Sequence, residues 1–102
     1  MKKIINGKLY DTDSAKIMAY YKSDYSVNDF HFYEETLYKK KTGEFFIFGE
    51  GNGLSNYAES VDINLSRTGK KIIPLSEGEA KKWAEERLSV DAYVDIFGEV
   101  EE

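Results

Sequence analysis

The sequence has no cysteine, one proline and one histidine in 102 residues. Without cysteine, the chain forms no disulfide framework and offers no thiolate as a nucleophile or metal ligand, as is usual in a reducing cytoplasm. No apolar run approaches the roughly 18 residues that a membrane-spanning helix requires. The opening residues MKKII pass at once into the polar residues NGK, which predicts no export signal. We therefore expect a cytoplasmic protein that does not associate with membranes.

Apolar residues are nevertheless plentiful, since 41% of the chain is hydrophobic and 15% is aromatic. This content suffices for one hydrophobic core, and the chain length is close to that of a typical domain. We predict a single domain over residues 1–102, in which residues 98–102 form a short acidic tail.

The net charge of −5 is unevenly distributed along the chain. Residues 1–70 hold ten basic and ten acidic residues, whereas residues 71–102 hold four basic and nine acidic residues, which accounts for the whole excess. Because this last third repels phosphates, we do not expect it to bind free nucleic acid. A basic protein surface, including one that normally holds nucleic acid, fits its charge better. The candidate contact residues are Glu79, Glu85, Glu86, Asp91, Asp95, Glu99, Glu101 and Glu102.

Turn signals and apolar patterns predict the elements of the N-terminal half. The dipeptide Asn6-Gly7 tolerates the positive φ angles of a type I′ turn, which predicts a small hairpin over residues 3–10. Residues 11–23 indicate a short helix, with an aspartate or threonine near its start as the N-cap. Residues 30–38 and 44–50 are expected to pair as an antiparallel hairpin, whose second strand is covered on both faces.

The C-terminal third contains the clearest helix signals. The residues KIIPL first indicate another strand, with its proline at the end or on a sheet edge. Ser76 and Glu79 form a capping box that begins a helix docked through Trp83. A second short helix is capped by Ser89 and ends at Gly98. The predicted fold class is α+β: a small antiparallel sheet, made of the N-terminal and central hairpins, packed with one N-terminal and two C-terminal helices.

Three closely spaced glycines, Gly49, Gly51 and Gly53, raise the question of a phosphate-binding loop. A dinucleotide fingerprint needs G-x-G-x-x-G before a helix, and a P-loop needs Gly-Lys-Ser/Thr. Here the spacing is G-x-G-x-G, no convincing helix follows, and the carboxylate of Glu50 would repel an anion. We therefore interpret the stretch as an irregular turn and expect no cofactor.

No group of residues has the composition of a catalytic or metal site. His31 is the only histidine, and catalysis would require a positioned partner, which Glu34 or Glu35 could supply only if the strand geometry allowed it. Asp11 and Asp13 begin like a calcium loop, but Lys16 and Lys22 replace its glycine and its glutamate. We expect a protein without catalytic residues, cofactor or metal.

Basic residues offer an alternative function in nucleic-acid binding or regulation. The candidates are Lys39, Lys40, Lys41, Arg67, Lys70 and Lys71. Because this half of the chain is net neutral, a solvated turn and a lysine-protected strand edge explain them as well. Tyrosines favour protein contacts when they are exposed, and this core is too small to bury all of Tyr20, Tyr21, Tyr25, Tyr33, Tyr38 and Tyr57.

Three stretches carry a resemblance to known proteins: KIINGKLYDTDSA, ETLYKKKTGEFF and KIIPLSEGEAKKWAEERL. The resemblance covers most of the chain, and it is to a family of small cargo proteins of conjugative elements, plasmids and phages of Gram-positive bacteria. These motifs are structural, so no functional residue carries over. Such cargo includes antagonists of host defence, among them anti-CRISPR proteins, which are often small, acidic and without enzymatic sites. The resemblance implies a non-enzymatic inhibitor in the bacterial host cell that binds a Cas nuclease such as Cas9, or its guide complex, through the acidic surface. A protein-interaction module of another kind is the remaining alternative.

Overall fold

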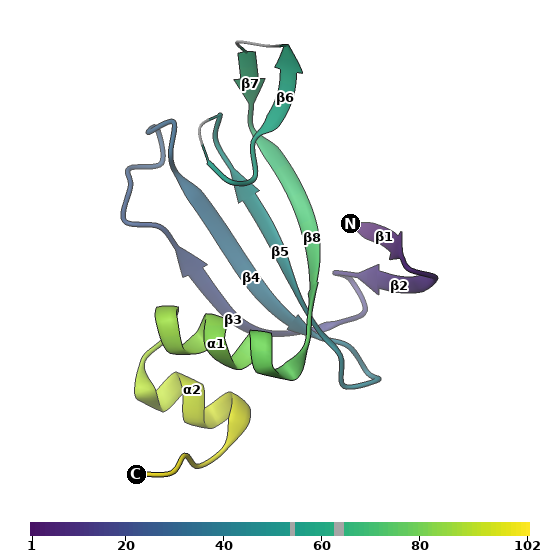
Figure 1. Cartoon of the computed structure of the whole chain (residues 1–102), viewed down its shortest axis with the longest axis vertical. Coiled ribbons are helices and arrows are strands. Elements are labelled where there is room, and N and C mark those ends of the chain that lie inside the picture. Colours follow the sequence, from purple (N-terminus) through teal and green to yellow (C-terminus); the bar gives the residue numbers. More distant parts are fainter. Residues whose placement is uncertain (54, 63–64) are drawn as a thin grey trace.

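The computed structural model describes residues 1–53, 55–62 and 65–102. Its centre is a four-stranded antiparallel sheet made, in spatial order, of β3 (Lys16–Lys22), β4 (Tyr33–Lys39), β5 (Phe45–Gly51) and β8 (Gly69–Leu75). Two hairpins and two helices accompany it: β1 (Lys2–Ile5) with β2 (Lys8–Asp11), β6 (Glu59–Asp62) with β7 (Leu65–Arg67), α1 (Glu77–Arg87) and α2 (Val90–Phe97). The helices lie at one end of the long axis and hairpin β6–β7 lies at the other (Figure 1).

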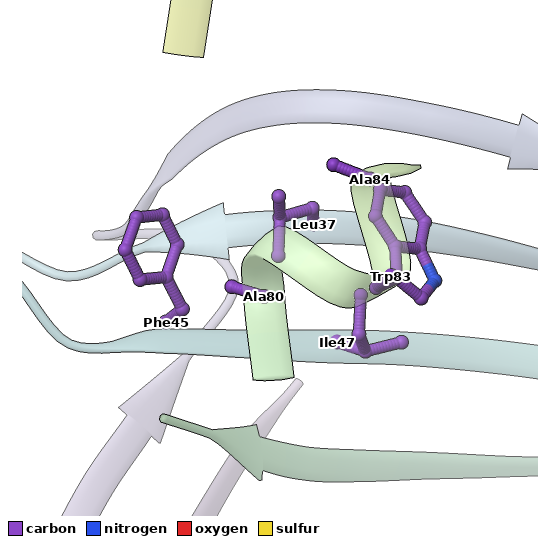
Figure 2. Packing of buried hydrophobic residues seen from close by; sticks show 6 residues of the cluster. All are labelled: Leu37, Phe45, Ile47, Ala80, Trp83 and Ala84. Carbon is purple, nitrogen blue, oxygen red and sulfur yellow. The ribbon is translucent and has the colours of Figure 1, made fainter. Parts of the chain in front are cut away.

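Alternating side chains of β5 divide the core into two layers. Phe45 and Ile47 face α1, which covers them with Ala80, Trp83 and Ala84 (Figure 2). On the opposite face, Phe46 stacks on the ring of Tyr38 with 5.0 Å between centroids, and Tyr10 of β2 meets it edge to face at 5.5 Å. The prediction of a central strand that is covered on both faces is therefore confirmed.

The predicted N-terminal helix is wrong, because residues 16–22 form the edge strand β3 and pair antiparallel with β4. The side chain of Asp11 accepts a hydrogen bond from the backbone N–H of Asp13 at 2.9 Å, which closes an Asx turn where a helix cap was expected. A register shift between Ile17 and Ala19 interrupts the alternation that would have indicated a strand. The fold is α+β, but both helices follow the sheet. The predicted single sheet of N-terminal and central hairpins is also wrong, because β1 and β2 form a two-stranded sheet of their own.

Most other predicted elements are present. Asn6 and Gly7 have φ angles of 51° and 76° in the hairpin turn between β1 and β2. Pro74 lies near the end of β8, which is an edge strand. The capping box is formed: the side chain of Ser76 accepts from the N–H of Glu79 at 3.1 Å, and the carboxylate of Glu79 accepts from the N–H of Ser76 at 2.8 Å. The second helix is also capped and ended by the predicted residues.

The interpretation of the glycine stretch as an irregular turn is wrong for Gly49 and Gly51, which lie inside β5 and pair with β8. A Cβ atom on Gly49 would lie 2.2 Å from the ring of Tyr57, and one on Gly51 would lie 2.0 Å from the Oγ of Ser55. The missing side chains therefore leave room for the segment after β5 to fold back over the sheet, a close approach that glycine in a strand permits.

We expect Gly49→Ala to lower the free energy of unfolding by about 1–3 kcal/mol, because the new methyl group overpacks the site and displaces the ring of Tyr57. Gly78→Ala is the matched control. A Cβ atom there meets only the Oγ of Ser76, at 3.9 Å, so alanine should raise stability by about 0.5–1 kcal/mol through its helix propensity. Urea denaturation of both variants measures the difference, and equal effects would contradict this role of Gly49.

Candidate functional site

Among the side chains that the structure describes, one carboxylate is buried: that of Glu35 on the helical face of β4, which is only 6% exposed. Its Oε1 accepts hydrogen bonds from Nε1 of Trp83 at 3.1 Å and from Nε of Arg87 at 2.7 Å. Its Oε2 accepts from the hydroxyl of Tyr57. The ion pair between Glu35 and Arg87 is therefore supported by two further donors, and no buried polar side-chain atom of the described part lacks a partner.

Local sequence brings these groups together. Trp83 and Arg87 are four residues apart on α1 and thus project from one face of the helix. The guanidinium carbon of Arg87 lies 5.4 Å from the ring centroid of Trp83 and 5.6 Å from that of Tyr21 on β3, so cation–π contacts hold it on both sides. Sequence reasoning missed this network, because apolar and polar residues alternate poorly in residues 33–36, YEET. Nothing in that pattern marks Glu35 as the buried residue.

The hydroxyl of Tyr57 is held in its neutral form. Burial raises the pKa of Tyr57 well above its usual value of 10.0, and the hydrogen bond to the carboxylate of Glu35 raises it further. A hydroxyl that donates to a carboxylate and ionises only at high pH is not an activated nucleophile. The network of Glu35, Trp83, Arg87 and Tyr57 therefore fastens α1 to the sheet.

His31 lies outside the strand in which it was predicted, in the turn before β4. Its backbone N–H and its Nδ1 both contact Oδ1 of Asp29, at 2.8 and 3.1 Å, and its ring stacks on Tyr25 with 5.3 Å between centroids. The backbone hydrogen bond, followed by that to the ring, lowers the pKa of Asp29. Within the described ranges, no group of three or more His, Asp or Glu side chains is placed to hold a metal ion.

The acidic candidates separate into three kinds. Glu79 is occupied by its own capping box, which also lowers its pKa through the backbone N–H of Ser76. Glu86 pairs with Arg87 at 3.3 Å. The others are exposed on the last turns of α1, on α2 and on the tail: Glu85, Asp91, Asp95, Glu99, Glu101 and Glu102.

An apolar hollow of about 350 Å³ lies between the end of α1, α2 and the tail, and two of these carboxylates line it. We call it the acidic groove. Val90 is 74% exposed and Val100 is 58% exposed, although both are aliphatic. Glu85 and Glu101 also contribute to its walls. The complete lining is Ala84, Glu85, Leu88, Ser89, Val90, Tyr93, Val94, Val100 and Glu101.

The structure does not bring the basic candidates to one place. Lys39 lies opposite Phe45 at one end of the sheet, whereas Lys70 lies opposite Glu50, about 17 Å further along the strands. Lys71 donates to the backbone oxygen of Asn56 at 3.2 Å, also away from the basic turn. The side chain of Arg67 lies outside the described residues. Only the run Lys39, Lys40 and Lys41 remains as a cluster.

The tyrosines also divide according to their exposure. Tyr38 and Tyr57 are buried, and Tyr21 and Tyr33 are partly buried. Tyr20 is exposed and donates to the carboxylate of Glu34 at 2.5 Å, a bond that raises the pKa of Tyr20 to about 12.

Comparisons with known proteins add no relative to this description. No protein-family model matches the chain, and neither a curated protein nor a solved structure matches it. In the part of the chain that the structure describes, no helix is long and apolar enough to cross a membrane.

We expect Glu35→Ala to lower the free energy of unfolding by about 3–5 kcal/mol, because it leaves Nε of Arg87 and the indole N–H of Trp83 without their acceptor. Glu34→Ala is the matched control, since this neighbouring glutamate points to the other face and, among the described residues, its side chain bonds only Tyr20. Its cost should stay near 1 kcal/mol. Chemical denaturation compares the two, and similar losses would show that the buried network does not hold α1 in place.

The raised pKa of Tyr57 predicts a particular response to alkaline pH. The folded state holds this proton more tightly than the unfolded state, so its stabilisation is complete below the usual pKa of 10.0 and decreases as pH rises above that value. The free energy of unfolding should fall above pH 10 more steeply for the wild type than for Tyr57→Phe, by about 1.4 kcal/mol per pH unit. Urea titrations over a pH series measure both slopes, and parallel curves would contradict the shift.

Proposed function

We propose that this chain is a non-enzymatic protein that binds a basic partner protein in the acidic groove. The observation that carries the proposal is the placement of exposed valines among unpaired carboxylates. Val90 and Val100 stand in the groove, and no ion pair within the described residues involves Glu85, Asp91 or Glu101.

An apolar floor with a charged rim is the arrangement found at protein-binding hot spots. A partner side chain that fills the hollow releases water from the valines, and the rim excludes solvent around it. The carboxylates favour a partner segment with lysine or arginine on either side of an aliphatic anchor. Charge attraction over the groove would make association fast and sensitive to salt.

The basic channel of an immune nuclease is the specific partner that we propose. A CRISPR nuclease of the Cas9 type holds its RNA–DNA heteroduplex in a positively charged channel. The resemblance to mobile-element cargo favours such a partner, and it would place the protein in the cytoplasm of a bacterial host. Inhibition would then result from occupation of the channel, without turnover of a substrate.

Absence of catalysis is part of the same proposal. The hydroxyl of Tyr57 and both oxygens of Glu35 are engaged in the buried network, and His31 is oriented by Asp29 with no nucleophile bonded to it in the described part. These contacts support a binding protein, because Tyr57, Glu35 and His31 each already have a structural partner.

We expect the wild-type chain to slow target-DNA cleavage by guide-loaded Cas9, and the variant Glu85→Lys/Glu101→Lys to lose at least about tenfold in potency. The variant reverses two charges on the rim of the groove and leaves its apolar floor intact. Cleavage is measured at several ratios of inhibitor to nuclease and at two salt concentrations, since higher salt should weaken the wild type.

The matched control is Asp13→Lys/Asp24→Lys, which changes the net charge equally at two exposed sites outside the groove. Its potency should remain that of the wild type. No inhibition at any ratio would exclude Cas9. Binding of a lysine-rich peptide with one leucine then tests the groove itself, and equal binding by both double variants would overturn the proposal.

A further inference from the structure

The turn from β4 to β5 lies at the lower right of Figure 1, and lysines line two hollows beside this turn. A hollow of about 380 Å³ between this turn and β2 adjoins one of about 300 Å³ between the turn and the start of β3. Three segments that are distant in sequence supply its lysines. We call this site the lysine groove: Lys8, Lys16, Lys39, Lys40 and Lys41.

Half of the lysine groove is electrically balanced. The carboxylate of Glu44 lies 3.2 Å from Nζ of Lys8 and 3.6 Å from Nζ of Lys40. The Lys40 side chain is only 15% exposed, because its Nζ sits 4.2 Å from the ring centroid of Tyr10. The hydrogen bond from Lys8, together with one from Thr42, lowers the pKa of Glu44. With Asp11 also in its wall, this half has little charge left for a ligand.

The other half contains a charge conflict. Lys16 and Lys39 lie directly opposite each other in the β3–β4 ladder, on the same face of the sheet. Like charges in this relation destabilise a sheet. No carboxylate within the described part of the chain pairs with either of them, and exposed Lys41 stands in the same hollow.

Protection of a sheet edge does not explain this arrangement. A lysine on an edge strand discourages pairing with other chains, which accounts for Lys16 on β3. Lys39, however, lies on β4, which has a neighbour on both sides. Local conflicts of this kind are expected where a sequence serves a function at the expense of stability.

We propose that Lys16, Lys39 and Lys41 bind the phosphate groups of a polyanion. A phosphate between the first two would replace their repulsion by two charge-assisted contacts, since opposed side chains start only about 5 Å apart. The hydroxyl of Ser14, which makes no hydrogen bond within the described residues, is a further donor in the same hollow. Lysine suits this ligand, because its ammonium group contacts phosphate as a compact point charge.

The proposal is independent of the acidic groove and narrows the basic candidates to one end of the sheet. Lys70 and Lys71 take no part, because Lys70 lies opposite Glu50 and both lie away from the hollow. The ligand chemistry is a chain of phosphates, either the backbone of a single-stranded nucleic acid or a free polyphosphate.

Two probes test the site at low salt: a short fluorescein-labelled single-stranded oligonucleotide and inorganic tripolyphosphate. We expect Lys39→Glu to weaken binding at least about tenfold and to reduce the salt dependence, because a phosphate contact is lost. Lys82→Glu, which makes the same charge change at an exposed position of α1, should bind as the wild type does. Fluorescence anisotropy measures binding of the first probe, and isothermal titration calorimetry measures binding of the second.

Thermal stability gives a second measurement of the site. A change of net charge alone would not produce the pattern of Tm values that we expect. Without ligand, Lys39→Glu should have a higher Tm than the wild type, since glutamate opposite Lys16 replaces a repulsive pair by an attractive one. Tripolyphosphate should raise the Tm of the wild type and of Lys82→Glu, but not that of Lys39→Glu.

The results of these measurements distinguish the two sources of phosphate from each other and show when the proposal fails. Binding of both probes supports a nucleic-acid backbone as the ligand, and binding of tripolyphosphate alone supports a free polyphosphate. If neither probe binds at low salt, or if Lys82→Glu weakens binding as much as Lys39→Glu does, the site is overturned.

Discussion

Burial of the Glu35 carboxylate is the constraint on which the helical side of this fold depends. A carboxylate in that position is tolerated only when its oxygens are bonded, and here Trp83, Arg87 and Tyr57 supply the donors. A shift of α1 by one residue along the sheet would break two of these bonds at once. An apolar residue in place of Glu35 would have made this core layer more hydrophobic but would not have fixed the position of α1 along the sheet. We therefore assign the buried ion pair a role in the specificity of helix packing.

The glycines of β5 belong to the same constraint. Tyr57 reaches Glu35 only because its ring lies over Gly49, and its backbone oxygen passes where a Cβ atom on Gly69 would lie at 1.9 Å. Two adjacent strands thus omit side chains beneath one tyrosine. The glycine-rich stretch that raised the question of a phosphate-binding loop therefore accommodates the aromatic ring of Tyr57.

Local signals in the sequence predicted the parts of the fold that local chemistry decides. The turn at Asn6-Gly7 and the capping box at Ser76 depend on neighbours within a few residues, and both are present. The first helix failed because pairing with β4 overrides the propensity of residues 16–22, and the bulge after Ile17 hides their alternation. Of the candidate site, the exposed acidic residues were predictable from composition. The groove that two of them line was not predictable from composition, because it requires the tail to return over α1 and α2.

The charged side chains of this protein divide into those that form ion pairs within the fold and those that are left without a partner of opposite charge in its described part. Glu35, Glu44 and Glu77 each pair with a base, and these pairs lie within the core layer, at the β4–β5 turn and along α1. At the acidic groove and the lysine groove the pattern reverses: two unpaired carboxylates line an apolar hollow, and two lysines oppose each other on adjacent strands. Phe45, beside Lys39, touches Phe97 at the end of α2, so the two surfaces flank a common helix. A partner that presents cationic side chains and phosphates side by side would satisfy both proposed sites, and the proposed nuclease with its guide RNA is a partner of this kind.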